Sequence, residues 1–192
     1  AQSSGTTTIA ASLAGEYAAI ATNLLTGCSN TTNALTLEVL PVQNIAIGSI
    51  GSASFCEGQS AVLELLVGIG TVQWQVNGQE LEGATGTVLQ VNSAATYTAQ
   101  VIDENGCTSS SNELSVEVYP LPTTALFIEG NGAPVLCGQG DVLVAQAETD
   151  DSYVWYASGE EVVGEVASAF EIVQPGEYAV QITNLYGCVA IS

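Results

Sequence analysis

The chain has 192 residues, of which 20 are Asp or Glu and none is Lys, Arg or His, so its formal net charge at pH 7 is −20. Binding to nucleic acid or to an anionic membrane surface requires cationic side chains, so both partners are excluded. General-base catalysis by His and Schiff-base chemistry by Lys are equally unavailable. No uninterrupted apolar run reaches the roughly 18 residues that a membrane-spanning helix needs.

The sequence repeats itself with a period of 81 residues. Rare residues of one copy recur in the next without a gap: Cys56, Trp74, Tyr97 and Cys107 match Cys137, Trp155, Tyr178 and Cys188. A truncated copy precedes them, because Tyr17 and Cys28 match Tyr97 and Cys107 at offsets of 80 and 79. Such periodicity predicts an array of similar structural units.

The unit boundaries are expected at Pro41 and Pro120, each of which closes an alternating apolar segment. Proline cannot donate a hydrogen bond to a strand ladder, and it stiffens a short linker. We therefore predict that residues 1–41 are the C-terminal part of one unit, 42–120 a complete unit, and 121–192 a unit lacking most of its last strand. Stiff joints favour an extended rod.

Apolar alternation predicts short strands along the middle unit. Residues 45–47, 62–67, 72–76, 89–91, 97–101 and 114–118 are the expected strands, with Asn77-Gly78 as a hairpin turn and 103–106 as another turn. The third unit repeats the pattern at 153–157, 170–172 and 178–182. No segment has helical periodicity. We predict an all-β chain of tandem immunoglobulin-like antiparallel β-sandwiches, with Trp74, Trp155, Tyr97 and Tyr178 in the cores.

The cysteines share one spacing, because 51 residues separate Cys56 from Cys107 and Cys137 from Cys188. This spacing predicts a disulfide within each unit, fastening one end of each sandwich, and a partner for Cys28 outside the chain. Structural metal binding is disfavoured because the chain has no Cys-x-x-Cys pair and no His. Disulfides indicate an oxidising, extracellular setting.

A recurring motif carries a family resemblance. Residues 176–188 read GEYAVQITNLYGC, with looser forms at 14–28 and 95–107, and a CEGQS segment begins at Cys56. The pattern resembles the Ig-like or PKD-like tandem repeats of secreted surface adhesins of Bacteroidota, including those similar to the gliding-motility adhesin. The resemblance implies non-catalytic repeats at the cell surface, and it transfers no catalytic residue.

Acidic residues are the only candidate ligands for a metal ion. Asp103, Glu104, Asp150, Asp151, Glu160 and Glu161 could offer oxygen atoms to Ca²⁺. Solvated loops and ordinary turn chemistry explain the same residues without a ligand. Apart from this possible Ca²⁺, no cofactor is expected.

Three functions fit these features. The first is a non-catalytic stalk of an extracellular adhesin or surface filament, whose partners are the adjacent repeats of one long chain. The second is a fibre subunit, in which a strand from an identical subunit completes residues 1–41. The third is a calcium-dependent or carbohydrate-binding module, which takes a surface glycan at loops around Tyr153, Tyr156 and Tyr186.

Overall fold

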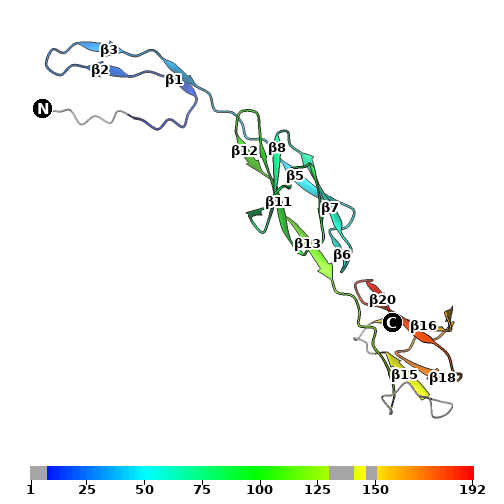
Figure 1. Cartoon of the computed structure of the whole chain (residues 1–192). Helices are drawn as coiled ribbons and strands as arrows, with labels where there is room; N and C mark the ends of the chain where they lie inside the picture. The colour runs from blue at the N-terminus through cyan, green and yellow to red at the C-terminus, as the bar shows by residue number, and fades with distance from the viewer. Residues whose placement is uncertain (1–7, 130–140, 146–150) are drawn as a thin grey trace.

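The computed structural model describes residues 8–129, 141–145 and 151–192, and every regular element in these residues is a β-strand. Within the same residues, no helix has the length and hydropathy that crossing a bilayer requires. Figure 1 shows a narrow N-terminal ribbon, a middle unit and a third unit that follow one another. The prediction of an all-β chain built from immunoglobulin-like sandwiches is confirmed.

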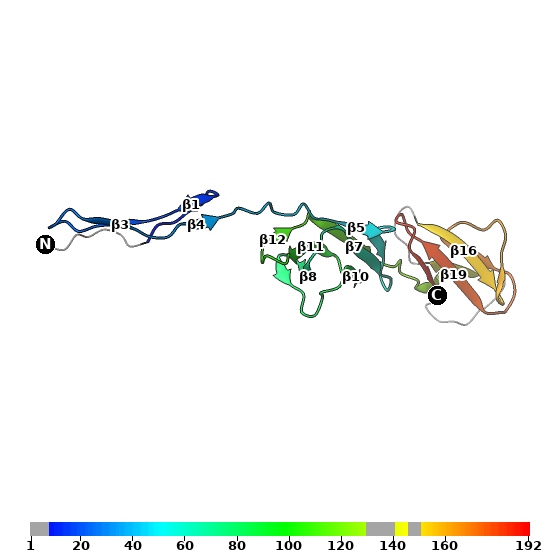
Figure 2. The ribbon, with the colours of Figure 1, turned by 90° about the horizontal axis from the view of Figure 1, so that it is seen from above.

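The N-terminal ribbon is a long hairpin (Figure 2), and within residues 8–41 no other sheet packs against it. Its strands pair antiparallel, β1 with β4 and β2 with β3; they are β1 (Gly15–Tyr17), β2 (Ile20–Thr22), β3 (Ser29–Thr31) and β4 (Leu35–Leu37). Tyr17 lies opposite Leu35, as Tyr97 lies opposite Leu114 in the middle unit. The ribbon therefore adopts the register of the corresponding hairpin in a complete unit.

The middle unit consists of two sheets that enclose one core. One sheet has the order β10-β7-β5, and the other has the order β6-β13-β11-β8-β9, with β12 also paired to β11. The strands are β5 (Ala46–Ile50), β6 (Ser54–Cys56), β7 (Ala61–Val67), β8 (Thr71–Val76), β9 (Gln79–Glu80), β10 (Val88–Val91), β11 (Ala95–Ile102), β12 (Thr108–Ser110) and β13 (Leu114–Tyr119).

Local sequence explains the central hairpin of this unit. Val72 and Trp74 point into the core while the residues between them are more exposed, as a half-buried strand requires. Asn77 and Gly78 both have positive φ, at 50° and 79°, and connect β8 to β9. Positive φ at both central residues is the type I′ geometry that matches the twist of the flanking strands. The predicted Asn77-Gly78 turn is confirmed.

The third unit repeats this plan in its described residues. One sheet has the order β14-β15-β18 and the other β17-β16-β19-β20. The strands are β14 (Leu126–Ile128), β15 (Asp141–Ala145), β16 (Ser152–Ala157), β17 (Glu160–Glu161), β18 (Ala169–Ile172), β19 (Tyr178–Thr183) and β20 (Val189–Ile191). Ser158 and Gly159 form the turn that corresponds to Asn77 and Gly78, again with positive φ.

Each of these two units has its own hydrophobic core. Trp74 packs with Leu63, Tyr97 and Val101 in the middle unit. Trp155 packs with Phe170, and its neighbours include Val180 and Ile182 in the third unit. Because no buried residue belongs to both clusters, the relation between the units depends on contacts at their ends.

Candidate functional site

A disulfide, an aromatic stack and a hydrogen bond lie together at the joint between the middle and third units. On the middle unit, β6 runs parallel to β13 and places Cys56 opposite Tyr119. Tyr119 is the last residue of β13, and Pro120 follows it. Cys56 is therefore held at the end of the sandwich from which the chain leaves for the third unit.

The third unit presents the turn between β19 and β20 to this end. Asn184 builds the turn: its backbone N–H donates to the Cys188 carbonyl at 3.0 Å, and its side-chain oxygen accepts from the backbone N–H groups of Tyr186 and Cys188 at 3.1 and 3.0 Å. This Asx-type bonding is why Asn suits the position. The turn fixes Cys188 so that its side chain is fully buried.

A disulfide joins the two units through Cys56 and Cys188, whose Cα atoms are 5.5 Å apart. The two residues are 132 positions apart, which is the 51-residue spacing within a unit plus one 81-residue repeat. The predicted Cys56–Cys107 bridge is therefore wrong. The predicted Cys137–Cys188 bridge is also absent, because Cys188 is bonded to Cys56; Cys137 itself lies outside the described residues. Cys28 and Cys107 are unbonded.

The middle unit cannot form the predicted bridge because its two cysteines lie at opposite ends. Cys56 is beside Tyr119, near the Ala95 end of β11. Cys107 follows the turn after Ile102, at the other end of that strand. An eight-residue strand spans about 23 Å at its usual rise, whereas bridged Cα atoms lie within about 7 Å of each other.

Two non-covalent contacts accompany the bridge. The rings of Tyr119 and Tyr186 stack with centroids 4.1 Å apart and planes 6° from parallel. The Asn184 side chain donates to the Pro120 carbonyl at 2.9 Å. Three kinds of contact, namely covalent, aromatic and hydrogen-bonded, thus connect the same two surfaces and oppose both rotation and bending at the joint.

Tyr119 also carries a polar contact within its own strand. Its hydroxyl donates to the Glu117 carboxylate at 2.6 Å. This hydrogen bond is the largest cause that raises the pKa of Tyr119 above its usual value, with partial desolvation as a second cause. The phenol thus supplies the Glu117 carboxylate, beside the joint, with a hydrogen-bond donor.

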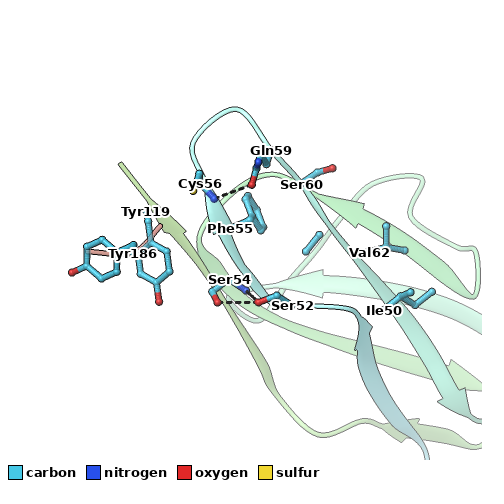
Figure 3. Close-up of a pocket in the computed structure, with 11 residues that line it drawn as sticks. Ile50, Ser52, Ser54, Phe55, Cys56, Gln59, Ser60, Val62, Tyr119 and Tyr186 are labelled. Atoms are coloured by element: carbon cyan, nitrogen blue, oxygen red, sulfur yellow. Dashed lines mark hydrogen bonds between the residues drawn. The ribbon is translucent and has the colours of Figure 1, made fainter. Parts of the chain in front are cut away.

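A hollow of about 500 Å³ lies beside the stacked tyrosines (Figure 3). Its walls include Phe55, Cys56 and Gln59 of the middle unit together with the two tyrosines, and none of its lining residues is charged. The Gln59 side chain accepts from the Cys56 backbone N–H at 3.2 Å, which ties the loop after β6 to the bridged cysteine. The hollow thus offers no carboxylate ligands for a cation.

The acidic residues predicted as calcium ligands are dispersed. Asp103 caps a turn, because its side chain accepts from the backbone N–H groups of Asn105 and Cys107, each at 2.9 Å. Glu160 and Glu161 form the exposed strand β17, Glu104 is exposed in the Asp103 turn, Asp151 precedes β16, and Asp150 lies outside the described residues. Nowhere in ranges 8–129, 141–145 and 151–192 do three potential ligands of this kind form a metal-sized group.

The three tyrosines around which the sequence predicts glycan-binding loops lie in one strand and one turn. Tyr153 and Tyr156 are residues of β16, and Tyr153 is buried in the third core. Tyr186 is in a turn, but its ring is stacked against Tyr119. Tyr153 and Tyr156 thus belong to a strand and Tyr186 to the joint, and glycan binding by loops around these residues stays a prediction.

The structure places the four predicted core aromatic residues as follows. Trp74 and Trp155 are fully buried, and their indole N–H groups donate to the carbonyls of Gly86 and Ala167 at 2.8 Å each. Tyr97 is buried and Tyr178 is half-buried. Their hydroxyls donate to backbone carbonyls four residues upstream, as the Tyr17 hydroxyl also does. This bond resembles the tyrosine corner of immunoglobulin-like folds.

Sequence reasoning missed Tyr119 and Asn184 as joint residues. A signal was present in that Tyr119 immediately precedes Pro120, at a predicted boundary. Asn184 occupies the same turn position as Asp103, and an amide, unlike a carboxylate, can both accept the turn hydrogen bonds and donate to the neighbouring unit. Neither signal identifies the partner surface without the fold.

No protein-family model matches the chain, and no curated protein is significantly similar to it. Solved structures similar in fold include the fibronectin(III)-like modules of CbhA from Clostridium thermocellum, at 12% identity over 76% of this chain and 90% of that one, with a TM-score of 0.38. Murine CEACAM1b is 14% identical over 78% of this chain and 96% of that one, also at 0.38. A Bacteroides ovatus glucan-utilisation protein, SGBP-B, solved with a mixed-linkage heptasaccharide, is 16% identical over 77% and 46%, at 0.32. Likenesses of this size concern the general fold and say nothing of function.

Proposed function

We propose that the chain is a structural stalk segment of an extracellular bacterial adhesin or surface filament, with no catalytic role. The observation that carries this proposal is the Cys56–Cys188 bridge between consecutive units. A disulfide inside one domain stabilises that domain, whereas a disulfide between domains fixes their relative position. Fixed position between successive units is what a spacer requires.

The other contacts of the joint support the same role. The Tyr119–Tyr186 stack and the Asn184 hydrogen bond act at the same surface as the bridge, so bending must break several contacts together. Domain pairs in one chain otherwise move relative to each other unless their interface is large and apolar. A small joint with a covalent bond achieves stiffness with few residues.

Location and partners follow as parts of the proposal. A disulfide persists in an oxidising compartment, so we place the chain outside the cytoplasm, at the cell surface. Its immediate partners would be adjacent repeats of the same long chain, and a surface glycan would be bound by another part of that chain. A net charge of −20 with no cation keeps neighbouring stalks apart by repulsion.

Electron microscopy of the native material tests the stalk. We expect a thin, beaded, unbranched rod made of one polypeptide of several repeats, whose mass under reducing and denaturing conditions greatly exceeds the 19.6 kDa of this chain. A polymer that dissociates into subunits of that mass would contradict a single-chain stalk.

One observation favours a fibre subunit as the second candidate. In the middle unit the Trp74 strand, β8, pairs with β11 along its whole length. The N-terminal ribbon has the counterpart of β11 in β1 and β2, but among the described residues no strand pairs with that edge. Ile20, on β2 at this edge, is 69% exposed. A strand from another copy could cover this edge, and the mass measurement above distinguishes the two candidates.

A further inference from the structure

The turn that presents Cys188 recurs in the middle unit around Cys107. The Asp103 N–H donates to the Cys107 carbonyl at 3.1 Å, and the Cys107 N–H donates to the Asp103 carboxylate at 2.9 Å. The corresponding bonds of Asn184 and Cys188 are both 3.0 Å. Cys107 is therefore held by the same backbone turn as the cysteine that forms the bridge.

Cys107 also lies at the equivalent end of its unit, where the chain enters. The Gln43 side chain, in the incoming segment, bonds both the N–H and the carbonyl of Ile69. Ile69 leads into β8, whose first residue, Thr71, pairs with Ile102. Cys107 follows Ile102 across the turn, so it lies on the side that receives the preceding unit.

The side chains of Cys188 and Cys107 differ in exposure, as expected if Cys188 has its disulfide partner and Cys107 lacks one. Cys188 is fully buried and bonded to Cys56, whereas Cys107 is unbonded and half-exposed. A half-exposed thiol in an oxidising compartment is an available partner for a second cysteine.

We infer that Cys107 is the site of a second inter-unit disulfide. Its partner is a cysteine in the Cys56 position of the preceding unit, beside the strand that leads into Pro41. The first cysteine of each unit is then bonded to the following unit (forward), and the second cysteine is bonded to the preceding unit (backward). Disulfides of this kind connect all units of the array in series. The inference rests on the serial arrangement proposed above. By the repeat, Cys28 takes the backward role in its own unit.

The bond forms by two successive thiol–disulfide exchanges. A disulfide donor, either a small-molecule disulfide or a protein disulfide, accepts the two electrons and is released as two thiols. The Cys107 and partner sulfur atoms each lose a proton and become joined by one S–S bond.

The joint between the N-terminal ribbon and the middle unit (the first joint) differs in its non-covalent contacts from the joint between the middle and third units (the second joint). Asn105 stands where the third unit has Tyr186, and Leu40 stands where the middle unit has Tyr119. Asp103 replaces Asn184, and an ionised carboxylate has no N–H to donate to the Pro41 carbonyl. The Cys107 disulfide is therefore the main restraint at the first joint. The second joint keeps its Tyr119–Tyr186 stack even when its disulfide is reduced.

A chain with one duplicated unit tests the inference. Residues 1–120 are followed directly by residues 42–192, so that one complete unit precedes another. Cys107→Ser in the first copy leaves a single Cys107, and Val42→Ala in the first copy, at an exposed position, adds a mass label to the peptide containing that copy's Cys56. Digestion after Glu without reduction, followed by mass spectrometry, identifies the partner of Cys107.

We expect Cys107 to be linked to the labelled Cys56 peptide, and the unlabelled Cys56 to be linked to Cys188. The matched control carries Cys56→Ser in the first copy, and there Cys107 should become reactive to iodoacetamide again. A link from Cys107 to the unlabelled Cys56, or a Cys107 that is free in both chains, overturns the inference. If Cys107 is free while Cys56–Cys188 forms, the stalk proposal still stands; if neither bridge forms, both fail.

Discussion

At the scale of single residues, the two tryptophans determine the cores. Trp74 and Trp155 are both fully buried and both donate the indole N–H to a backbone carbonyl twelve residues later. Each ring thus contributes a large apolar surface and fastens a loop to the sheet. The sequence predicted this role, because the middle and third units each have one Trp, which lies in an alternating strand.

Trp74→Ala should lower the free energy of unfolding of the middle unit by about 3–5 kcal/mol, because it leaves a large cavity and an unpaired carbonyl at Gly86. Urea denaturation followed by far-UV circular dichroism measures the loss. Ile69→Ala, at a side chain that is 83% exposed, is the matched control and should change little. Equal losses in the two variants would contradict the central position of Trp74.

Tyr97 makes the middle unit sensitive to alkali. Burial raises its pKa above the ordinary value of 10.0. The unfolded chain therefore ionises first, so the stabilisation is complete below about pH 10 and is lost as pH rises from there through the higher folded-state pKa. Tyr97→Phe should weaken the fall in stability above pH 10, and at neutral pH it should cost about 1 kcal/mol for the hydroxyl bond to Ser93.

Urea denaturation of the wild type and of Tyr97→Phe at pH 8 and pH 11 measures this effect, with the free thiols alkylated beforehand to prevent disulfide exchange. The same fall in stability in both proteins would show that Tyr97 does not carry the alkaline sensitivity.

At the scale of elements, side chains complete hydrogen bonding where strand pairing is irregular. The register of β5 against β7 shifts between Ala46 and Ile47. There the Asn112 side chain accepts from the Ile47 N–H at 3.0 Å and donates to the Ile47 carbonyl at 3.3 Å. Asn112 thus acts as a one-residue strand partner, and it ties β5 to the segment that precedes β13.

Asn112→Ala should destabilise the middle unit by about 1–3 kcal/mol, because it leaves the N–H of buried Ile47 without a partner. Hydrogen exchange at the Ile47 amide should accelerate more than exchange in β11. Asn92→Ala, at an exposed residue outside the strands, is the control. Unchanged exchange at Ile47 in Asn112→Ala would exclude this role.

The elements themselves were largely predictable. Alternation in the sequence predicted the Trp74 strand, and the Asn77-Gly78 pair predicted its turn, because both features are local. The Asn112 contact was not predictable. It joins residues 65 positions apart, and nothing in the local pattern marks an Asn that replaces a strand partner.

At the scale of the whole molecule, the joint determines the arrangement of the units. The Cys56–Cys188 bridge lies outside both cores, so breaking it should leave each sandwich folded while the third unit gains freedom to reorient. The contacts that then remain, the Tyr119–Tyr186 stack with one ring 50% exposed to water and the single Asn184 hydrogen bond to Pro120, are a weak restraint.

Cys56→Ser should therefore broaden the pair-distance distribution in small-angle X-ray scattering and leave the far-UV circular dichroism spectrum unchanged. Cys28→Ser removes an unbonded cysteine of the ribbon and is the matched control, which should scatter like the wild type. Measurements at about 0.15 M salt screen the repulsion between the carboxylates beyond about 8 Å. A distribution that stays narrow in Cys56→Ser would mean that the non-covalent contacts suffice.

The sequence by itself determined the all-β class and the identity of the residues that fill each core. These properties depend on alternation, turn residues and the 81-residue repeat, all of which are written along the chain. Only the tertiary structure decided which cysteines bond. In a repeating chain, a spacing of 51 within a unit and of 132 across two units are equally regular, so sequence intervals cannot distinguish them. The strand β11 separates Cys56 from Cys107, whereas the turn of the third unit that carries Cys188 lies against Cys56, and a covalent bond requires that proximity.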